Sequence, residues 1–98
     1  MSIHSPIRIH WDPAKAKANL AKHDVAFAEA ATVCDDVRAI TRQDPDSVGE
    51  ERFVTLGLSG SGNLLVVVYS WRDAETIRLI SAWKANAKQR KQYAQGSG

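Results

Sequence analysis

The chain has 98 residues, of which 44% are apolar and 24% are charged, a composition typical of one folded domain and unlike that of a disordered chain. No apolar run approaches the roughly 20 residues of a membrane helix, and residues 1–5 lack the features of a secretory signal. Residues 1–50 hold six Lys or Arg and eight Asp or Glu, whereas residues 51–98 hold seven and three. The basic half favours a polyanionic partner, nucleic acid before membrane, with a solvated helix face as an equal alternative.

Cysteine and histidine are sparse in this chain. The single Cys34 excludes an internal disulfide and suits the reducing cytosol, so we expect a cytoplasmic protein. No Cys/His spacing suits zinc, and the acids do not cluster at the spacing of metal ligands. The sequence therefore predicts neither a metal nor a cofactor.

The N-terminal third predicts a short strand and two helices. Residues 7–11 alternate in hydrophobicity as a strand does. Asp12 as N-cap and Pro13 at the first helical position begin a helix that continues through the Ala- and Lys-rich residues 14–23. Residues 27–35 place apolar side chains at spacings of three and four, which predicts a second, short helix.

After Asp36 the period changes to two. The predicted strands cover residues 37–42, 51–58, 64–70 and 76–82, and a helix covers 84–95. The Gly- and Asn-containing segment 59–63 is a hairpin turn, and the continuous apolar run 64–70 predicts a central strand. The result is an α+β fold: two N-terminal helices, an antiparallel sheet of about three to four strands, and a C-terminal helix, with all helices on one side of the sheet. We expect one domain over 1–98, with 1–6 and 96–98 disordered.

Several cations are candidates for binding phosphate. Arg72 precedes the last predicted strand, Arg78 lies within it, and Lys84 and Lys88 are one helical turn apart. We expect these groups to converge at the end of the sheet, because Arg grips phosphate bidentately and Lys supplies a point charge. The alternative is that Arg78 is an exposed strand residue paired with an acid such as Glu75. Strict alternation would place Ser81 on the face opposite Arg78.

His23 and two tryptophans are further candidates. His23 suits general acid–base chemistry, although a histidine at a helix C-terminus also serves the helix dipole alone. Trp71 and Trp83 stand beside Arg or Lys, as aromatic residues that stack on single-stranded bases do, or else they pack against the edges of the fold.

Two blocks of residues have a familiar spacing. The first runs from Trp11 to His23 with the pattern W-D-x-x-K-x-x-x-N-x-x-K-H, and an aromatic residue follows it. The second comprises Glu51-Arg52, Gly57, residues 64–68, Arg72, residues 77–82, Lys84-Ala85 and Tyr93. Together they resemble the BrnT toxins over residues 7–93.

This resemblance implies a fold like that of RelE-type ribonucleases and a toxin of a type II toxin–antitoxin system. It implies RNA cleavage by metal-independent attack of the 2′-OH, and neutralisation by a BrnA-like ribbon-helix-helix antitoxin through which alone the pair contacts operator DNA; no membrane is involved. Within this framework we expect Arg72 and Arg78 to stabilise transition-state charge, Lys84 to contact phosphate and His23 to transfer a proton. The residues expected to hold RNA are Lys88, Lys91, Trp83 and Tyr93.

The chain departs from the family pattern near its end. Trp83 stands where the family usually has Arg, Asn86 replaces Thr and Gln89 replaces Glu. These departures leave open a weakened nuclease, or one in which the indole stacks on a base. The alternative class is a non-catalytic small binding module that acts through a protein or a nucleic acid.

Overall fold

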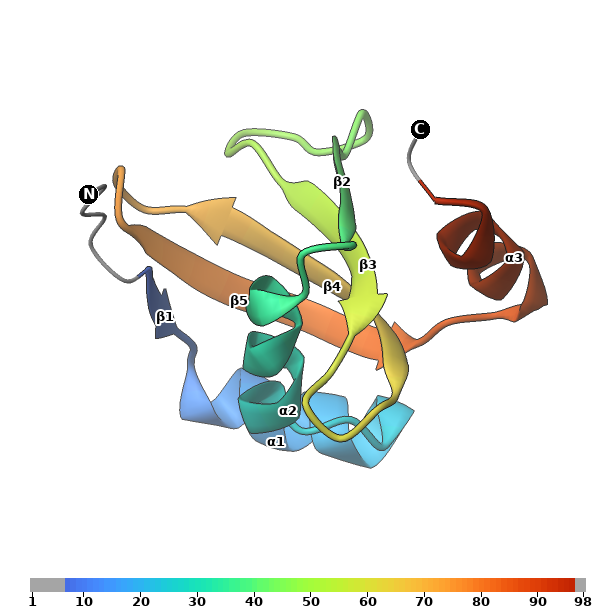
Figure 1. Cartoon of the computed structure of the whole chain (residues 1–98). Coiled ribbons are helices and arrows are strands. Elements are labelled where there is room, and N and C mark those ends of the chain that lie inside the picture. Colours follow the sequence, from blue (N-terminus) through green and yellow to red (C-terminus); the bar gives the residue numbers. More distant parts are fainter. Residues whose placement is uncertain (1–6, 97–98) are drawn as a thin grey trace, which may run out of the picture.

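In a computed structural model that describes residues 7–96, the chain forms a five-stranded sheet with helices on both faces (Figure 1). The strands are β1 (Arg8–His10), β2 (Ile40–Gln43), β3 (Phe53–Leu58), β4 (Leu64–Trp71) and β5 (Thr76–Lys84). The helices are α1 (Pro13–His23), α2 (Phe27–Ala31), the 3-10 turn η1 (Thr32–Asp35) and α3 (Ala87–Gln95). The disorder expected for 1–6, 97 and 98 lies outside the described residues, whereas Gly96 forms the C-cap of α3. None of the helices within 7–96 has the length and apolarity needed to cross a bilayer.

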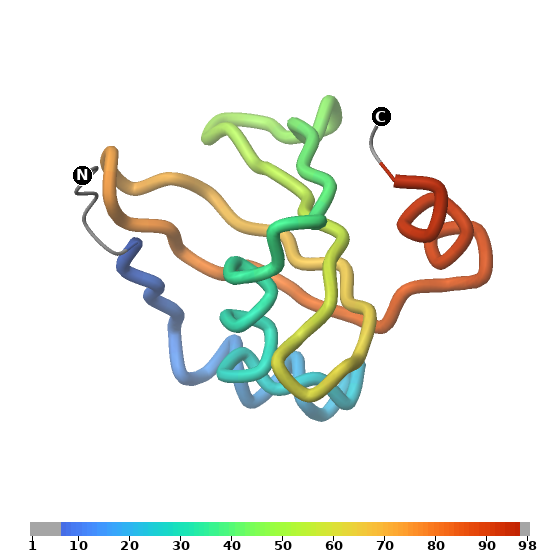
Figure 2. Tube along the Cα trace, viewed as in Figure 1, coloured from blue at the N-terminus to red at the C-terminus, as the bar shows by residue number. Residues whose placement is uncertain are grey.

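The sheet has the order β1-β5-β4-β3-β2 and is mixed. Strands β2 to β5 form the predicted antiparallel meander, but β1 pairs in parallel with β5, with Ile9 opposite Ile77. Figure 2 shows this first strand lying beside β5. The prediction of three to four antiparallel strands is therefore wrong. Short turn sequences between two strands predict an antiparallel pair. A parallel pair is joined by a long connection, so no local sequence pattern predicts the pairing.

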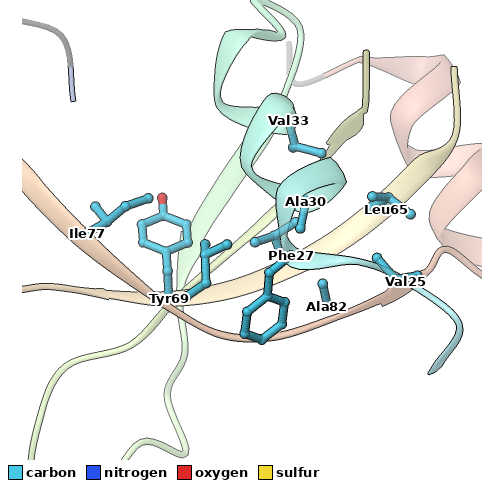
Figure 3. Packing of buried hydrophobic residues seen from close by; sticks show 10 residues of the cluster. Val25, Phe27, Ala30, Val33, Leu65, Tyr69, Ile77 and Ala82 are labelled. Atoms are coloured by element: carbon cyan, nitrogen blue, oxygen red, sulfur yellow. The ribbon is translucent and has the colours of Figure 1, made fainter. Parts of the chain in front are cut away.

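The prediction that all helices lie on one side of the sheet is also wrong. One cluster gathers α2 and η1 with Leu65, Val67 and neighbouring side chains of β4 and β5 (Figure 3). Leu64 and Val66, which alternate with them along β4, belong to a second cluster that includes Tyr93 of α3. Because β4 is apolar on both faces, each face needs its own cover. The interpretation of residues 64–70 as a central strand is confirmed.

A β-bulge shifts the alternation within β5. Val68 pairs with Ser81 and Tyr69 with Leu79, so Ile80 is an extra residue on β5. Side chains on opposite residues of an antiparallel pair share a face, and Val68 shares its face with Ser70, the partner of Arg78. Ser81 therefore lies on the same face as Arg78, not on the opposite one.

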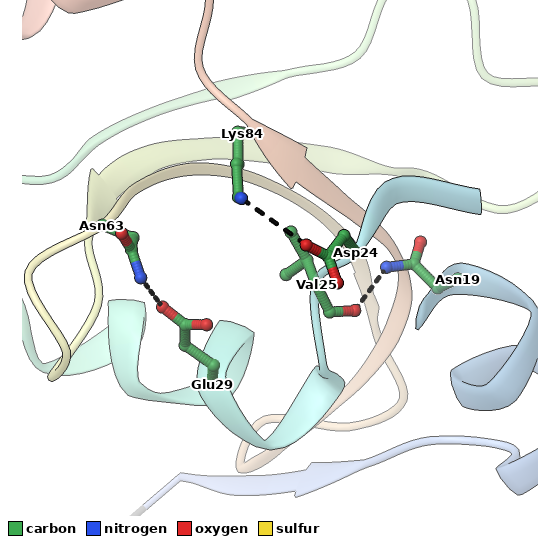
Figure 4. Close-up of polar contacts among 6 residues, drawn as sticks. All are labelled: Asn19, Asp24, Val25, Glu29, Asn63 and Lys84. Carbon is green, nitrogen blue, oxygen red and sulfur yellow. Dashed lines mark hydrogen bonds and ion pairs between the residues drawn. The ribbon is translucent and has the colours of Figure 1, made fainter. Parts of the chain in front are cut away.

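Asn19 fastens α1 to the edge of β5 that the short β1 leaves uncovered. Its Nδ2 donates to the carbonyl of Ala82 at 2.9 Å, and its Oδ1 accepts from the N–H of Ala82 at 3.1 Å, as a neighbouring strand would do. The same Nδ2 donates to the carbonyl of Val25 at 3.0 Å (Figure 4). This buried amide thus satisfies main-chain groups of two segments, which explains the asparagine of the first sequence block.

Two further contacts hold η1 and α2 against the sheet. A Cβ at Gly57 would stand 2.8 Å from Cγ1 of Val33, so a glycine lets β3 approach η1. Glu29 of α2 accepts hydrogen bonds from Ser59 Oγ and Asn63 Nδ2 in the β3–β4 hairpin, and these bonds lower the pKa of its carboxyl group. Figure 4 shows the bond from Asn63.

Candidate active site

A row of three polar residues crosses the centre of the sheet on the face that α3 partly covers. Ser70 of β4 pairs with Arg78 of β5. Arg52 directly precedes β3, one position beyond the Phe53–Tyr69 pair, which places it beside Ser70. Since opposite residues share a face, all three side chains emerge on one side. We call Arg52, Ser70 and Arg78 the arginine row.

The arginine row contains buried polar atoms that lack partners. Nε of Arg52, Oγ of Ser70 and Nε of Arg78 are buried and make no hydrogen bond within the described part of the chain. Ser70 is 1% exposed. An unmade hydrogen bond at a buried donor costs about 1–3 kcal/mol, so three such atoms side by side are unusual. Two guanidinium N–H groups and a hydroxyl are donors, and together they suit the oxygens of an anion.

Arg78 carries a carboxylate partner. Its Nη2 donates to Oε1 of Glu50 at 2.7 Å, with the two side chains 33% and 43% exposed. The alternative that Arg78 pairs with an acid is therefore confirmed, but the acid is Glu50 of the loop between β2 and β3, not the neighbouring Glu75. The pair places one acid beside the arginine row.

His23, Trp83 and Lys84 form a separate group at the far end of β5. The rings of His23 and Trp83 are 5.9 Å apart at an interplanar angle of 42°. Together with Lys22 and Ser81, these three residues line a groove between the end of α1 and β5. Nζ of Lys84 lies 3.8 Å from Oδ2 of Asp24 (Figure 4). The structure thus brings together in one groove three residues that the sequence analysis proposed as site residues.

The expected convergence of Arg72, Arg78 and Lys84 is wrong for Lys84. Arg72 lies in the hairpin at one end of β5 and Lys84 is the last residue at the other. Lys84 pairs with Leu65, and Leu65 lies on the opposite face of the sheet from Ser70, so Lys84 and Arg78 emerge on opposite faces. Lys84 is six residues from Arg78, roughly 20 Å along an extended strand. The N–H of Arg72 donates to the carbonyl of Thr76 across the hairpin, so Arg72 lies opposite a residue two positions from Arg78.

The residues of α3 that were expected to hold RNA have three different environments. Lys88 lines a groove between α3 and the sheet, together with Arg42 and the apolar Val54, Leu56 and Val66. Lys91 is exposed. The hydroxyl of Tyr93, expected to contact RNA, donates instead to Asp36 at 2.6 Å.

Two of the three departures from the family pattern form the cap of α3. Asn86 Oδ1 accepts from the N–H of Gln89 at 2.8 Å, and Gln89 Oε1 accepts from the N–H of Asn86 at 2.8 Å. This reciprocal pair is a capping box, in which Thr and Glu would serve equally. Asn86 and Gln89 therefore preserve a helix start. Trp83 lies in the groove beside His23 and is not a member of the arginine row, so its substitution for Arg removes no cation from that row.

Sequence reasoning missed Arg52, Ser70 and Glu50 as site residues. Arg52 and Ser70 each lie at the end of an apolar strand, and a polar residue that continues the buried face of a strand is the signal that could have revealed them. Glu50 lies in a polar loop and gives no such signal.

These features define a small α+β domain with a cationic sheet face suited to phosphate. A family model described as "Ribonuclease toxin, BrnT, of type II toxin-antitoxin system" matches residues 11–89, and the chain belongs to this family. Its fold is similar to the 1.1 Å crystal structure of the Brucella abortus ribonuclease toxin BrnT, with a TM-score of 0.61 and 22% identity over 82% of this chain and 97% of that chain. A comparison with curated proteins found no match. The family is one of toxins, and a type II toxin has an antitoxin partner.

Proposed function

We propose that this protein is an endoribonuclease toxin whose arginine row binds the scissile phosphate of RNA. The observation that carries the proposal is the alignment of three buried, unpartnered polar atoms of Arg52, Ser70 and Arg78 across three adjacent strands. The side chain of Arg78 is 33% exposed, so its guanidinium can donate further N–H groups to a phosphate diester, and charge-assisted bonds from arginine are about twice as strong as neutral ones.

The proposed reaction uses cations of the chain in place of a metal. The 2′-oxygen attacks the adjacent phosphorus, the bond to the 5′-oxygen breaks, and the products carry a 2′,3′-cyclic phosphate and a 5′-hydroxyl. Negative charge grows on the phosphoryl oxygens during this attack. Arg52 and Arg78 would stabilise that charge, and removing one donor of such a set typically costs 2.7–4 kcal/mol in the barrier, roughly a hundredfold or more in rate.

The proposed partner is a BrnA-like ribbon-helix-helix antitoxin, in the cytoplasm. Support comes from family membership and from the composition of α3, which contains Lys88, Arg90 and Lys91 and no acid. An acidic or amphipathic antitoxin segment would find both charge and apolar surface in the groove beside Lys88. Operator DNA would be contacted only through the antitoxin.

Incubation of the purified protein with single-stranded RNA in EDTA tests the proposal. We expect cleavage with 5′-hydroxyl termini, and a loss of about a hundredfold in the Arg78→Ala variant. Lys17→Ala, which removes an exposed cation of α1, is the control and should cleave normally. Cleavage that appears only after a divalent ion is added would contradict the metal-free reaction. Intact RNA under both conditions would favour the non-catalytic binding module.

A further inference from the structure

The proposed reaction needs a group that takes the proton of the 2′-hydroxyl. That hydroxyl is on the ribose joined to the scissile phosphate, so its acceptor must lie beside the cations that hold this phosphate. A general base must come within about 2.6–3.2 Å of the proton-bearing oxygen. The candidates for the general base are therefore the titratable side chains next to the arginine row.

His23, which the sequence favoured for proton transfer, lies in a different place. Its ring contacts Trp83, and Trp83 pairs with Val66, four residues along β4 from Ser70. Four residues of an antiparallel strand span about 13 Å. A histidine that contacts this indole lies too far along the sheet to reach the 2′-oxygen of a nucleotide whose phosphate lies on the arginine row.

Two titratable side chains lie beside Arg78 on this face, His10 of β1 and Glu50. Within residues 7–96 only Glu50 forms a hydrogen bond to Arg78, and we infer that Glu50 is the general base of RNA cleavage. Its Oε1 lies 2.7 Å from Nη2 of Arg78, a cation assigned above to the phosphate. The charged or titratable side chains that share this face near it are Arg52, Arg72 and Arg78. Arg8 and His10 of β1 lie opposite Thr76 and Arg78, and Arg42 on β2 is further along. The inference rests on the proposed function, because it assigns a role within that reaction.

The step balances without a further cofactor. The carboxylate of Glu50 takes the proton from the 2′-hydroxyl as the 2′-oxygen forms its bond to phosphorus. The bond between phosphorus and the 5′-oxygen breaks, and the leaving oxygen takes a proton from water. Glu50 then releases its proton, which neutralises the hydroxide left by that water. When RNA binds, phosphate oxygens replace Oε1 of Glu50 at Arg78, which frees the carboxylate to turn toward the ribose.

Glu50→Gln separates proton transfer from binding and folding. Glutamine keeps an oxygen that accepts from Arg78, but it cannot take a proton at neutral pH. We expect kcat to fall by about 10²–10⁴ and the decline of rate toward low pH to disappear. Binding of a non-cleavable 2′-O-methyl oligonucleotide should be unchanged or tighter, and Tm should stay within a few degrees. Glu51→Gln, the exposed neighbouring acid, is the matched control. Added formate should restore part of the activity of Glu50→Ala.

Each result has a distinct meaning. Glu50→Gln activity within about threefold of the unaltered protein, with the same pH profile, would overturn the role of Glu50 and leave the proposed function standing. Loss of oligonucleotide binding or of folding together with activity, and no rescue by formate, would make Glu50 a structural partner of Arg78 and overturn the inference. No cleavage by the unaltered protein, with or without divalent ions, would overturn the proposed function and the general base with it.

Discussion

The hydroxyl of Tyr93 donates a hydrogen bond of 2.6 Å to Oδ2 of Asp36, which joins α3 to the turn between η1 and β2. The same oxygen accepts from the N–H of Leu58, and Oδ1 accepts from the N–H of Arg38. Burial alone would raise the pKa of Asp36, but these hydrogen bonds lower it below its ordinary value of 3.8. The bond raises the pKa of Tyr93 in turn. No residue of α3 is fully buried, so this bond is a principal anchor of the helix.

Tyr93→Phe should lower Tm, by an amount that depends on pH. Because the pKa of Asp36 is lower in the folded state, its contribution is present above the unfolded value of 3.8 and is lost as pH falls through the folded pKa. The raised pKa of Tyr93 means that its contribution is lost only as pH rises above 10.0. Thermal unfolding of both proteins at pH 7, 5 and 2.5 measures this. A difference in Tm that does not change with pH would show that the charge of Asp36 does not contribute to this bond.

Asn19→Ala should be strongly destabilising. It leaves the N–H and carbonyl of Ala82 and the carbonyl of Val25 without their partner, in a buried setting. At about 1–3 kcal/mol for each buried group, of which solvent relaxation recovers part, we expect a loss of roughly 2–4 kcal/mol in the free energy of unfolding. Urea denaturation measures it, with the exposed Lys17→Ala of the same helix as control. A loss under about 1 kcal/mol would mean that water replaces the amide.

The group at the end of β5 should affect RNA affinity more than the chemical step. His23, Trp83 and Lys84 line one groove away from the arginine row, so His23→Ala and Trp83→Arg should change KM by severalfold. Their kcat values should stay within about threefold, because uniform binding changes KM alone. Steady-state kinetics on a short RNA checks this. A hundredfold fall in kcat for His23→Ala would indicate that His23, and not Glu50, transfers the proton.

Reversal of charge on α3 should weaken two interactions together. Lys88 borders the groove next to the sheet and Lys91 is exposed on the same helix. Lys88→Glu with Lys91→Glu should reduce the affinity for both RNA and antitoxin, and both affinities should fall as salt rises. Binding titrations at two ionic strengths measure the affinity for RNA and the affinity for the antitoxin. Lost RNA cleavage with intact antitoxin binding would mean that the antitoxin binds elsewhere, for instance on the acidic N-terminal half.

Arg72 and Arg78 looked alike in the sequence and differ in the structure. Arg72→Ala should cost far less activity than Arg78→Ala, because Arg72 is exposed in the β4–β5 hairpin, whereas Arg78 has a buried Nε and pairs with the buried Ser70. Parallel assays of the two variants give the comparison. Equal losses would mean that Arg72, two residues beyond Ser70, also contacts the phosphate.

Local chemistry was predictable, and pairing between distant segments was not. Asp12 caps α1 through a 2.8 Å bond from the N–H of Ala14 to its Oδ1, as its place before Pro13 predicted. The hairpin at 59–63 and the buried strand after it also follow from residue type. The parallel β1 and the position of α3 depend on contacts across the fold. No short-range pattern encodes them.

The candidate site was partly predictable for the same reason. Arg78 was selected for its charge, but its neighbours depend on the register of β3, β4 and β5. One extra residue, Ile80, decides which side chains of β5 share a face with Arg78. A bulge of this kind changes every assignment beyond it and leaves no mark in composition or periodicity.

The attachment of the N-terminal segment has a consequence for folding order. The bonds between Asn19 and Ala82 join residues 63 apart, and β1 pairs with β5 over a still longer separation. Strands β2 to β5 instead close through short connections, which cost less chain entropy. We therefore expect the meander to form early and the N-terminal strand and helix to dock last. Glu50, Arg52, Ser70 and Arg78 all belong to the early part. Assembly of the charged surface would then precede closure of the domain around it.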